Sequence, residues 1–148
     1  PEVCVTGGEP LAQAACRELL ATLADAGHRV SLETSGALSI AGLDPRVRCV
    51  MDLKAPGSGE ADKNLWDNLD HLRPHDEVKF VLAGRADYDW AKDVLERHGL
   101  ARRATVLFSP VTGELAPSTL ADWIVADRLP VRFQLQLHKI LWGDARGK

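Results

Sequence analysis

The chain has 148 residues, a mildly acidic net charge of −3 and a pI near 5.9. This length suits one domain with a core of its own, and the lack of a basic excess argues against a nucleic-acid-binding protein. No apolar run reaches the roughly 18 residues of a transmembrane helix, and the first residues, Pro-Glu-Val, do not resemble a signal peptide.

Strand-like and helical patterns alternate along the chain, which predicts a parallel sheet with right-handed crossovers. Apolar spacing and helix-stop glycines predict helices at 13–26 and 88–98, and a third helix capped by Ser118. The linkers after the second and third strands look irregular, so uneven helical cover of the sheet is expected. The predicted strands are 3–6, 29–33, 48–53, 77–82, 105–108 and 131–137.

The cysteines number three, an odd count with no close pair, at Cys4, Cys16 and Cys49. A disulfide framework is therefore not expected, and a reducing cytoplasm is the default compartment. Each cysteine has apolar or helical neighbours, which predicts buried structural thiols.

Polar, Gly- or Pro-containing segments follow five of the predicted strands, and in parallel β/α folds that edge of the sheet binds ligands. Any one of them fits an ordinary turn or a solvated charge, but five on one rim favour a site. Asp52 follows apolar residues and needs a polar partner. The segments are Gly-Gly-Glu-Pro, Glu-Thr-Ser-Gly, Asp-Leu-Lys-Ala-Pro, Ser-Pro-Val and Gln-Leu-His-Lys.

The Gly7-Gly8-Glu9-Pro10 turn is the most informative of these segments. Adjacent glycines let the backbone approach a ligand closely because no Cβ intervenes. Glu9 adds a carboxylate suited to an ammonium group. On its own the motif is also compatible with a simple tight turn.

Three of these strand ends, Gly7-Gly8-Glu9-Pro10, Glu33-Thr34-Ser35-Gly36 and Asp52-Leu53-Lys54, resemble the radical S-adenosylmethionine superfamily. Three further segments make the chain similar to its 7-carboxy-7-deazaguanine synthase family, and the likeness spans essentially the whole chain. They are Val78-Lys79-Phe80-Val81, Phe108-Ser109-Pro110-Val111 and Gln134–Trp142, which contains Leu-Gln-Leu-His-Lys.

The resemblance implies an α/β fold, a partial (β/α) barrel of parallel strands of the radical S-adenosylmethionine type. It implies a lyase of queuosine and deazapurine biosynthesis. The reaction is a radical ring contraction of 6-carboxy-5,6,7,8-tetrahydropterin, with loss of ammonia, to 7-carboxy-7-deazaguanine. A radical formed from S-adenosylmethionine starts the reaction, so the cofactor carries the chemistry and the protein orients it.

The resemblance also implies where the ligands bind, although no catalytic residue is assigned. S-adenosylmethionine is expected at Gly7, Gly8, Glu9, Gly36, Lys79, Ser109 and Pro110. The pterin is expected at Thr34, Gln136, His138 and Lys139. Alternation along the last predicted strand places Gln134, Gln136 and His138 on one face.

The chain departs from the family pattern in lacking the cysteine triplet that holds a 4Fe-4S cluster, because its own cysteines are too widely spaced. We therefore expect residues 1–148 to be the C-terminal portion of the core domain, inactive alone. The first strand, cluster loop and first helix would lie upstream, and so would the Mg²⁺ ligands, with no metal ligand in this chain.

The resemblance further implies a cytoplasmic homodimer reduced by flavodoxin or ferredoxin, with no nucleic-acid or membrane partner. Trp66, Trp90, Trp123 and Trp142 offer apolar surface that a dimer could use, but ordinary core or helix-face packing is the favoured interpretation. Two alternatives stay open: another radical enzyme, such as a glycyl-radical activating enzyme, and a non-catalytic β/α domain that binds a nucleotide or an amino acid.

Overall fold

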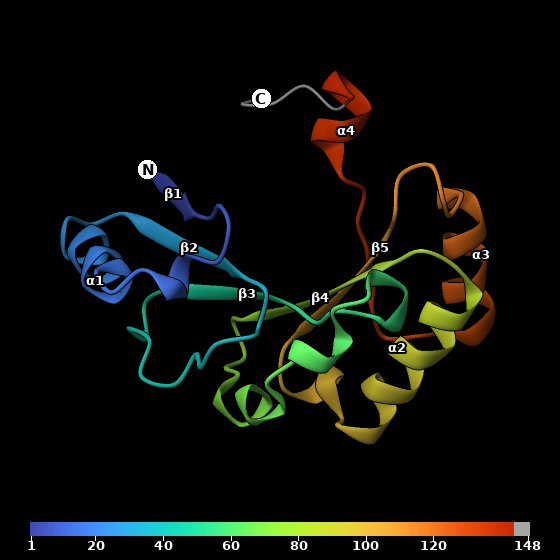
Figure 1. Ribbon diagram of the computed structural model, residues 1–148, viewed down its shortest axis with the longest axis horizontal. Coiled ribbons are helices and arrows are strands. Elements are labelled where there is room, and N and C mark those ends of the chain that lie inside the picture. The colour runs from blue at the N-terminus through green and yellow to red at the C-terminus, as the bar shows by residue number, and fades with distance from the viewer. Residues whose placement is uncertain (144–148) are drawn as a thin grey trace.

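A computed structural model describes residues 1–143, except for the side chain of His138. Six strands form one parallel sheet in the order β1-β2-β3-β4-β5-β6. Spatial order follows chain order, so every carboxyl end lies on one rim, as the sequence predicted (Figure 1). The strands are β1 (Glu2–Val5), β2 (Arg29–Thr34), β3 (Arg48–Asp52), β4 (Glu77–Leu82), β5 (Thr105–Pro110) and β6 (Arg132–Phe133).

The crossovers confirm the uneven helical cover that the sequence predicted. Helices α1 (Cys16–Asp25), α2 (Arg85–Arg97) and α3 (Pro117–Asp127) follow β1, β4 and β5. No helix of any kind separates β2 from β3, and only short 3-10 helices separate β3 from β4. Within residues 1–143 the 3-10 helices are η1 (Pro10–Ala12), η2 (Pro56–Ser58), η3 (Ala61–Lys63), η4 (Trp66–His71) and η5 (Leu100–Arg102).

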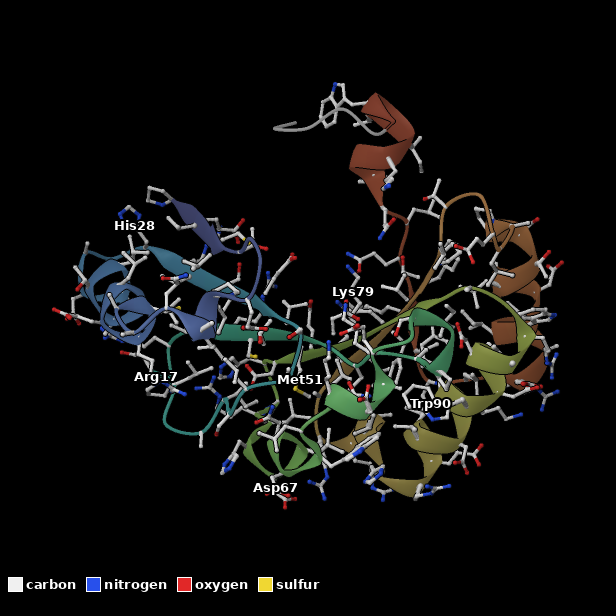
Figure 2. The ribbon with its side chains drawn as sticks, in the orientation of Figure 1. Arg17, His28, Met51, Asp67, Lys79 and Trp90 are labelled. Carbon is white, nitrogen blue, oxygen red and sulfur yellow. The ribbon has the colours of Figure 1, made fainter. Side chains whose placement is uncertain are left out.

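The two faces of the sheet differ in burial. Leu32 pairs with Cys49 and Met51 with Val78, and all four side chains are fully buried in the core beneath the helices. On the other face, register pairs Asp52 with Lys79, and both remain partly accessible. Figure 2 shows Lys79 on the open side of the strands and Met51 on the packed side. The sheet therefore keeps one polar face free for a ligand.

Helix α3 begins earlier than predicted, which corrects the assignment of its cap. The N-cap is Ala116, Pro117 lies in the first turn, and Ser118 is already inside the helix. Proline suits the first helical position because its fixed φ matches the helix and its missing N–H would have no partner there.

The strand predicted at 131–137 is wrong beyond Phe133. β6 contains only Arg132 and Phe133, and Leu137–Trp142 forms a short helix, α4. Gln134 still donates its backbone N–H to the Phe108 carbonyl at 2.9 Å, but no further pairing with β5 follows. Gln134, Gln136 and His138 therefore do not share the face of a strand.

No helix among residues 1–143 is both long and apolar enough to cross a membrane. Cys16 and Cys49 are buried as predicted, whereas Cys4 is exposed, so the prediction for Cys4 was wrong. Cys4 lies on β1, which has a neighbouring strand on one side only, so nothing in the described chain covers it.

Candidate functional site

The carboxyl ends of β1, β2 and β3, together with Lys79 from within β4, line a crevice of about 140 Å³ on the open face of the sheet. A cavity of about 830 Å³ lies at the amino ends of β1 to β3, but apart from Glu33 it contains none of the strand-end residues. Three of the predicted motifs meet in the smaller crevice. Its lining residues are Thr6, Gly8, Glu33, Thr34, Ser35, Val50, Asp52, Lys54 and Lys79.

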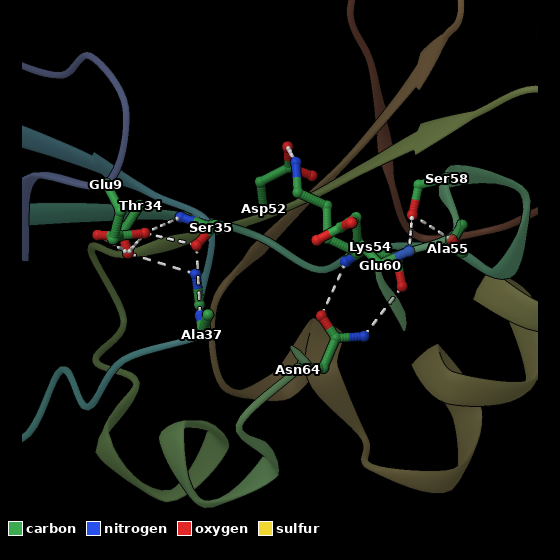
Figure 3. A network of polar contacts seen from close by, with 11 residues as sticks. Glu9, Thr34, Ser35, Ala37, Asp52, Lys54, Ala55, Ser58, Glu60 and Asn64 are labelled. Atoms are coloured by element: carbon green, nitrogen blue, oxygen red, sulfur yellow. Dashed lines mark hydrogen bonds and ion pairs between the residues drawn. The ribbon is translucent and has the colours of Figure 1, made fainter. Parts of the chain in front are cut away.

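The Glu9 carboxylate joins the turn after β1 to the end of β2 (Figure 3). Its Oε1 accepts the Leu11 N–H at 3.1 Å, and the Thr34 hydroxyl lies 2.8 Å from Oε1 and 3.0 Å from Oε2. Oε2 also accepts the Ser35 N–H at 2.8 Å and the Ser35 hydroxyl. We call this arrangement the Glu9 clasp: Glu9, Leu11, Thr34 and Ser35.

The Glu9 clasp stabilises the charged carboxylate. Partial burial raises the pKa of Glu9, but hydrogen bonds from Ser35, Thr34 and Leu11 outweigh it and hold the pKa below its usual value. The Thr34 hydroxyl donates to Glu9, and Thr34 is only 4% exposed. Thr34 therefore lines the crevice chiefly through its backbone.

Glycines shape both turns that flank the crevice. Gly7 and Gly8 have φ of 101° and 56°, and Gly36 has φ of 73°, values that strain residues with a Cβ. A Cβ at Gly36 would also lie 2.9 Å from Met51 Cγ. The turn after β2 is thus closely packed on β3, which explains why a glycine is needed at Gly36.

An ion pair on β3 was missed as part of the site. Lys54 Nζ lies 2.7 Å from Asp52 Oδ2, whereas Asp52 Oδ1 is buried and accepts no hydrogen bond from the described residues. Lys79, the register neighbour of Asp52, has no ion pair within 1–143. Only the apolar run before Asp52 hinted at this. The crevice is therefore lined by the Asp52 carboxylate, which has one buried oxygen without a partner among the described residues, and by the side chains of Lys54 and Lys79.

Ser109 and Pro110, expected near the cofactor, end β5 outside the lining of the crevice. Ser109 is 0% exposed and its hydroxyl has no partner in the described part of the chain. The structure places Ser109 on the same rim as Gly8 and Gly36, but not in the same cavity.

The C-terminal residues expected at the substrate lie apart from the crevice. The Gln136 side chain is 3.5 Å from the Thr112 hydroxyl, and Lys139 lies in α4, which stands away from the sheet in Figure 1. The side chain of His138 lies outside the described residues. Four exposed apolar side chains belong to α4: Leu137, Ile140, Leu141 and Trp142.

Within residues 1–143, no three His, Cys, Asp or Glu side chains gather as a metal site. Burial, with a smaller contribution from Asp76, raises the pKa of Cys49 to about 12. Burial also raises the pKa of Cys16. Because one cysteine is exposed, two are buried and the three are not gathered at one place, the described side chains do not fit a 4Fe-4S cluster, which is held by clustered cysteines.

No known family profile matches the chain, but individual proteins do. It is 46% identical to the 7-carboxy-7-deazaguanine synthase of Chlorobaculum tepidum, over 99% of this chain and 69% of that protein. It is 40% identical to the synthase of the same name from Koribacter versatilis, over 93% of this chain and 67% of that protein.

Solved structures support the fold. The crystal structure of QueE from Escherichia coli matches with a TM-score of 0.70 at 20% identity, over 91% of this chain and 56% of that one. Streptococcus suis SuiB bound to S-adenosylmethionine matches with a TM-score of 0.64 at 10% identity, over 91% of this chain and 38% of that one. The sequence relatives carry the assignment further: the chain belongs to the 7-carboxy-7-deazaguanine synthase family.

Proposed function

We propose that this chain is part of a radical S-adenosylmethionine lyase that converts 6-carboxy-5,6,7,8-tetrahydropterin into 7-carboxy-7-deazaguanine. The observation that carries the proposal is family membership at 46% identity, which is supported by a polar crevice formed by the family's strand-end motifs. The two rival functions considered from the sequence have no comparable observation behind them.

The crevice fits the polar part of S-adenosylmethionine. The cofactor carries an ammonium, a carboxylate and ribose hydroxyls, and the crevice presents the Asp52 carboxylate, the Lys79 ammonium and the Gly8 backbone. We assign cofactor contacts to Gly7, Gly8, Glu9, Gly36, Lys79, Ser109 and Pro110. When bound, the cofactor supplies the radical chemistry.

We propose two roles for Glu9, one in holding a turn and one in binding the cofactor. Its oxygens already accept several hydrogen bonds from the chain, so its clear contribution is to hold the turn of Gly7 and Gly8 against the end of β2. Its negative charge still favours an ammonium at this place. The part of Thr34 in binding the pterin is then through its backbone, since its hydroxyl serves Glu9.

The remaining substrate contacts are assigned to Gln136, which caps α4, and to His138 and Lys139 within it. For them to meet a pterin in the crevice, the segment after β6 must approach the open face of the sheet. The long, polar side chains of Gln136 and Lys139 suit the amide edge and the carboxylate of such a substrate.

We further propose that residues 1–148 form the C-terminal portion of the core domain. The 4Fe-4S ligands and the Mg²⁺ site would lie on a segment that precedes residue 1, consistent with the 69% of the Chlorobaculum protein that the chain spans. A flavodoxin or ferredoxin reductant, a homodimer and a cytoplasmic location complete the proposal.

Anaerobic assay of the full-length protein tests this function. With reductant, S-adenosylmethionine, Mg²⁺ and 6-carboxy-tetrahydropterin, we expect 7-carboxy-7-deazaguanine and ammonia, which mass spectrometry and an ammonia assay detect. Cleavage of S-adenosylmethionine without conversion of the pterin would instead indicate another radical enzyme, and absence of cofactor binding would indicate a different class of protein.

A further inference from the structure

Two buried asparagines lie in the connection between β3 and β4, where 3-10 helices replace the usual crossover helix. Asn64 is 7% exposed and Asn68 is fully buried. Neither lines the crevice. A buried amide must be hydrogen-bonded to be tolerated, so the partners of these two side chains show what they hold.

Asn68 binds the turn that follows β2. Its Nδ2 donates to the Gly36 carbonyl at 3.1 Å and to the Leu38 carbonyl at 2.9 Å, while its Oδ1 accepts the Ile40 N–H at 2.9 Å. The Leu65 N–H also donates to the Gly36 carbonyl, at 3.1 Å. The carbonyl of Gly36 is therefore fixed toward the β3–β4 connection.

Asn64 binds the turn that follows β3 (Figure 3). Its Oδ1 accepts the Lys54 N–H at 2.9 Å and its Nδ2 donates to the Lys54 carbonyl at 2.9 Å. One side chain thus satisfies both backbone groups of Lys54, as a neighbouring strand would. Because its backbone is held, Lys54 can keep its ammonium on Asp52 Oδ2, while the buried Oδ1 has no partner among the described residues.

We propose that Asn64 and Asn68 are positioning residues that set the two ligand-binding turns through Lys54 and Gly36. This inference rests on the proposed function. Both turns leave the sheet where the strand ladder ends, so without the asparagines their backbones lose the contacts that replace the ladder. A displacement of about 1 Å in a binding group can reduce activity by about a hundredfold.

Asn68→Ala and Asn64→Ala in the full-length protein test the proposal. The dissociation constant of S-adenosylmethionine, the KM and kcat for the pterin, and the free energy of unfolding are measured for each. We expect Asn68→Ala to weaken cofactor binding by about tenfold or more, and Asn64→Ala to raise the cofactor's dissociation constant or the KM similarly.

Asp76→Asn is the matched control. Asp76 is also fully buried near the same connection and accepts the N–H groups of Cys49 and Arg73, at 2.8 and 2.9 Å, but at the amino end of the strands. It should lower stability while changing cofactor affinity by less than about threefold, since it holds no ligand-binding turn.

Asn64→Asp keeps the volume and the acceptor for the Lys54 N–H, but places an oxygen against the Lys54 carbonyl. It should weaken binding as Asn64→Ala does. If Asn68→Ala does not fold, the ligand binding of Asn64→Asp tests the inference in its place. Ligand binding that is unchanged in the folded asparagine variants, or that changes as in Asp76→Asn, would overturn the inference. Failure of the wild type to convert pterin would count against the proposed function alone, because cofactor binding remains measurable.

Discussion

Glu9 illustrates how one side chain can serve both the turn and the ligand site. From the sequence, its carboxylate was expected to bind the ammonium of the cofactor. In the structure it accepts hydrogen bonds from Leu11, Thr34 and Ser35, the last two about 25 positions away along the chain. Those partners cannot be inferred from the motif, because only folding brings the ends of β1 and β2 together.

Glu9→Gln is expected to lower both the stability of the fold and the affinity for S-adenosylmethionine. One carboxylate oxygen becomes an NH₂ group that cannot accept from Leu11 or Ser35, which leaves a partly buried donor unsatisfied at a cost of about 1–3 kcal/mol. Loss of a charge-assisted bond weakens cofactor binding by about tenfold to a hundredfold.

Thermal unfolding and calorimetric titration of the full-length Glu9→Gln variant separate these effects. A lowered melting temperature with unchanged affinity would make Glu9 a structural residue only. Weaker binding at an unchanged melting temperature would instead contradict the structural importance of the Glu9 clasp.

The Glu9 clasp also predicts a pH dependence of stability. The folded-state pKa of Glu9 lies below its ordinary value of 4.5. Its contribution to stability is therefore complete above pH 4.5 and is lost as the pH falls through the lower folded-state pKa. Chemical denaturation of the wild type and Glu9→Gln should show a difference in unfolding free energy that is constant near neutral pH and shrinks in acid. A difference that does not change with pH would exclude this carboxylate as its source.

Among the elements, the central strands were predictable and the last one was not. β4 has the predicted bounds, Glu77–Leu82, because its alternation of buried and accessible residues follows directly from the sheet. Polar and apolar residues also alternate over 131–137, but β6 is an edge strand and pairs with β5 through two residues only. Sequence alternation cannot show where a neighbouring strand ends.

The turn after β2 offers a clean test of close packing between elements. Gly36→Ala should destabilise the protein by about 1–3 kcal/mol, because the alanine would have a positive φ and its Cβ would contact Met51. Gly42→Ala is the control, since Gly42 has a similar φ of 71° but nothing within 4 Å of the added Cβ. The excess loss of unfolding free energy in Gly36→Ala measures the contact with Met51. Equal losses in the two variants would show that the turn adjusts freely.

For the whole molecule, the parallel topology explains why strand-end motifs located a site before any contact was known. Consecutive parallel strands bring their carboxyl ends to one rim, so Gly8, Thr34 and Asp52 meet in a single crevice, which Lys79 joins as the register neighbour of Asp52. The sequence predicted that Asp52 needs a polar partner but not that the partner is Lys54, and no motif indicated the two buried asparagines. The roles of these residues depend on hydrogen-bond and ion-pair partners that only folding brings next to them.

The same topology argues that the described chain cannot assemble a 4Fe-4S cluster. Cys4 pairs with Ser31 and Cys49 with Leu32, so the alternation along β2 places Cys4 and Cys49 on opposite faces of the sheet. Cys16 lies buried in α1. Cys49 is fully buried on β3, so neither of these two thiols is free to meet Cys4 around one cluster, which is held by cysteines gathered at one place.

Residues 1–148 expressed alone are therefore expected to take up no stoichiometric cluster. Anaerobic reconstitution with iron and sulfide should leave the visible spectrum without the broad absorbance of a 4Fe-4S centre, while the full-length protein treated in parallel should gain it. A Cys4→Ser variant controls for adventitious iron on the exposed thiol, and any weak absorbance should disappear with it. A stoichiometric cluster that survives Cys4→Ser would require Cys16 and Cys49 to leave the core. That result would contradict the packing of α1 and β3. It would also contradict the proposal that the cluster ligands lie on a segment preceding residue 1.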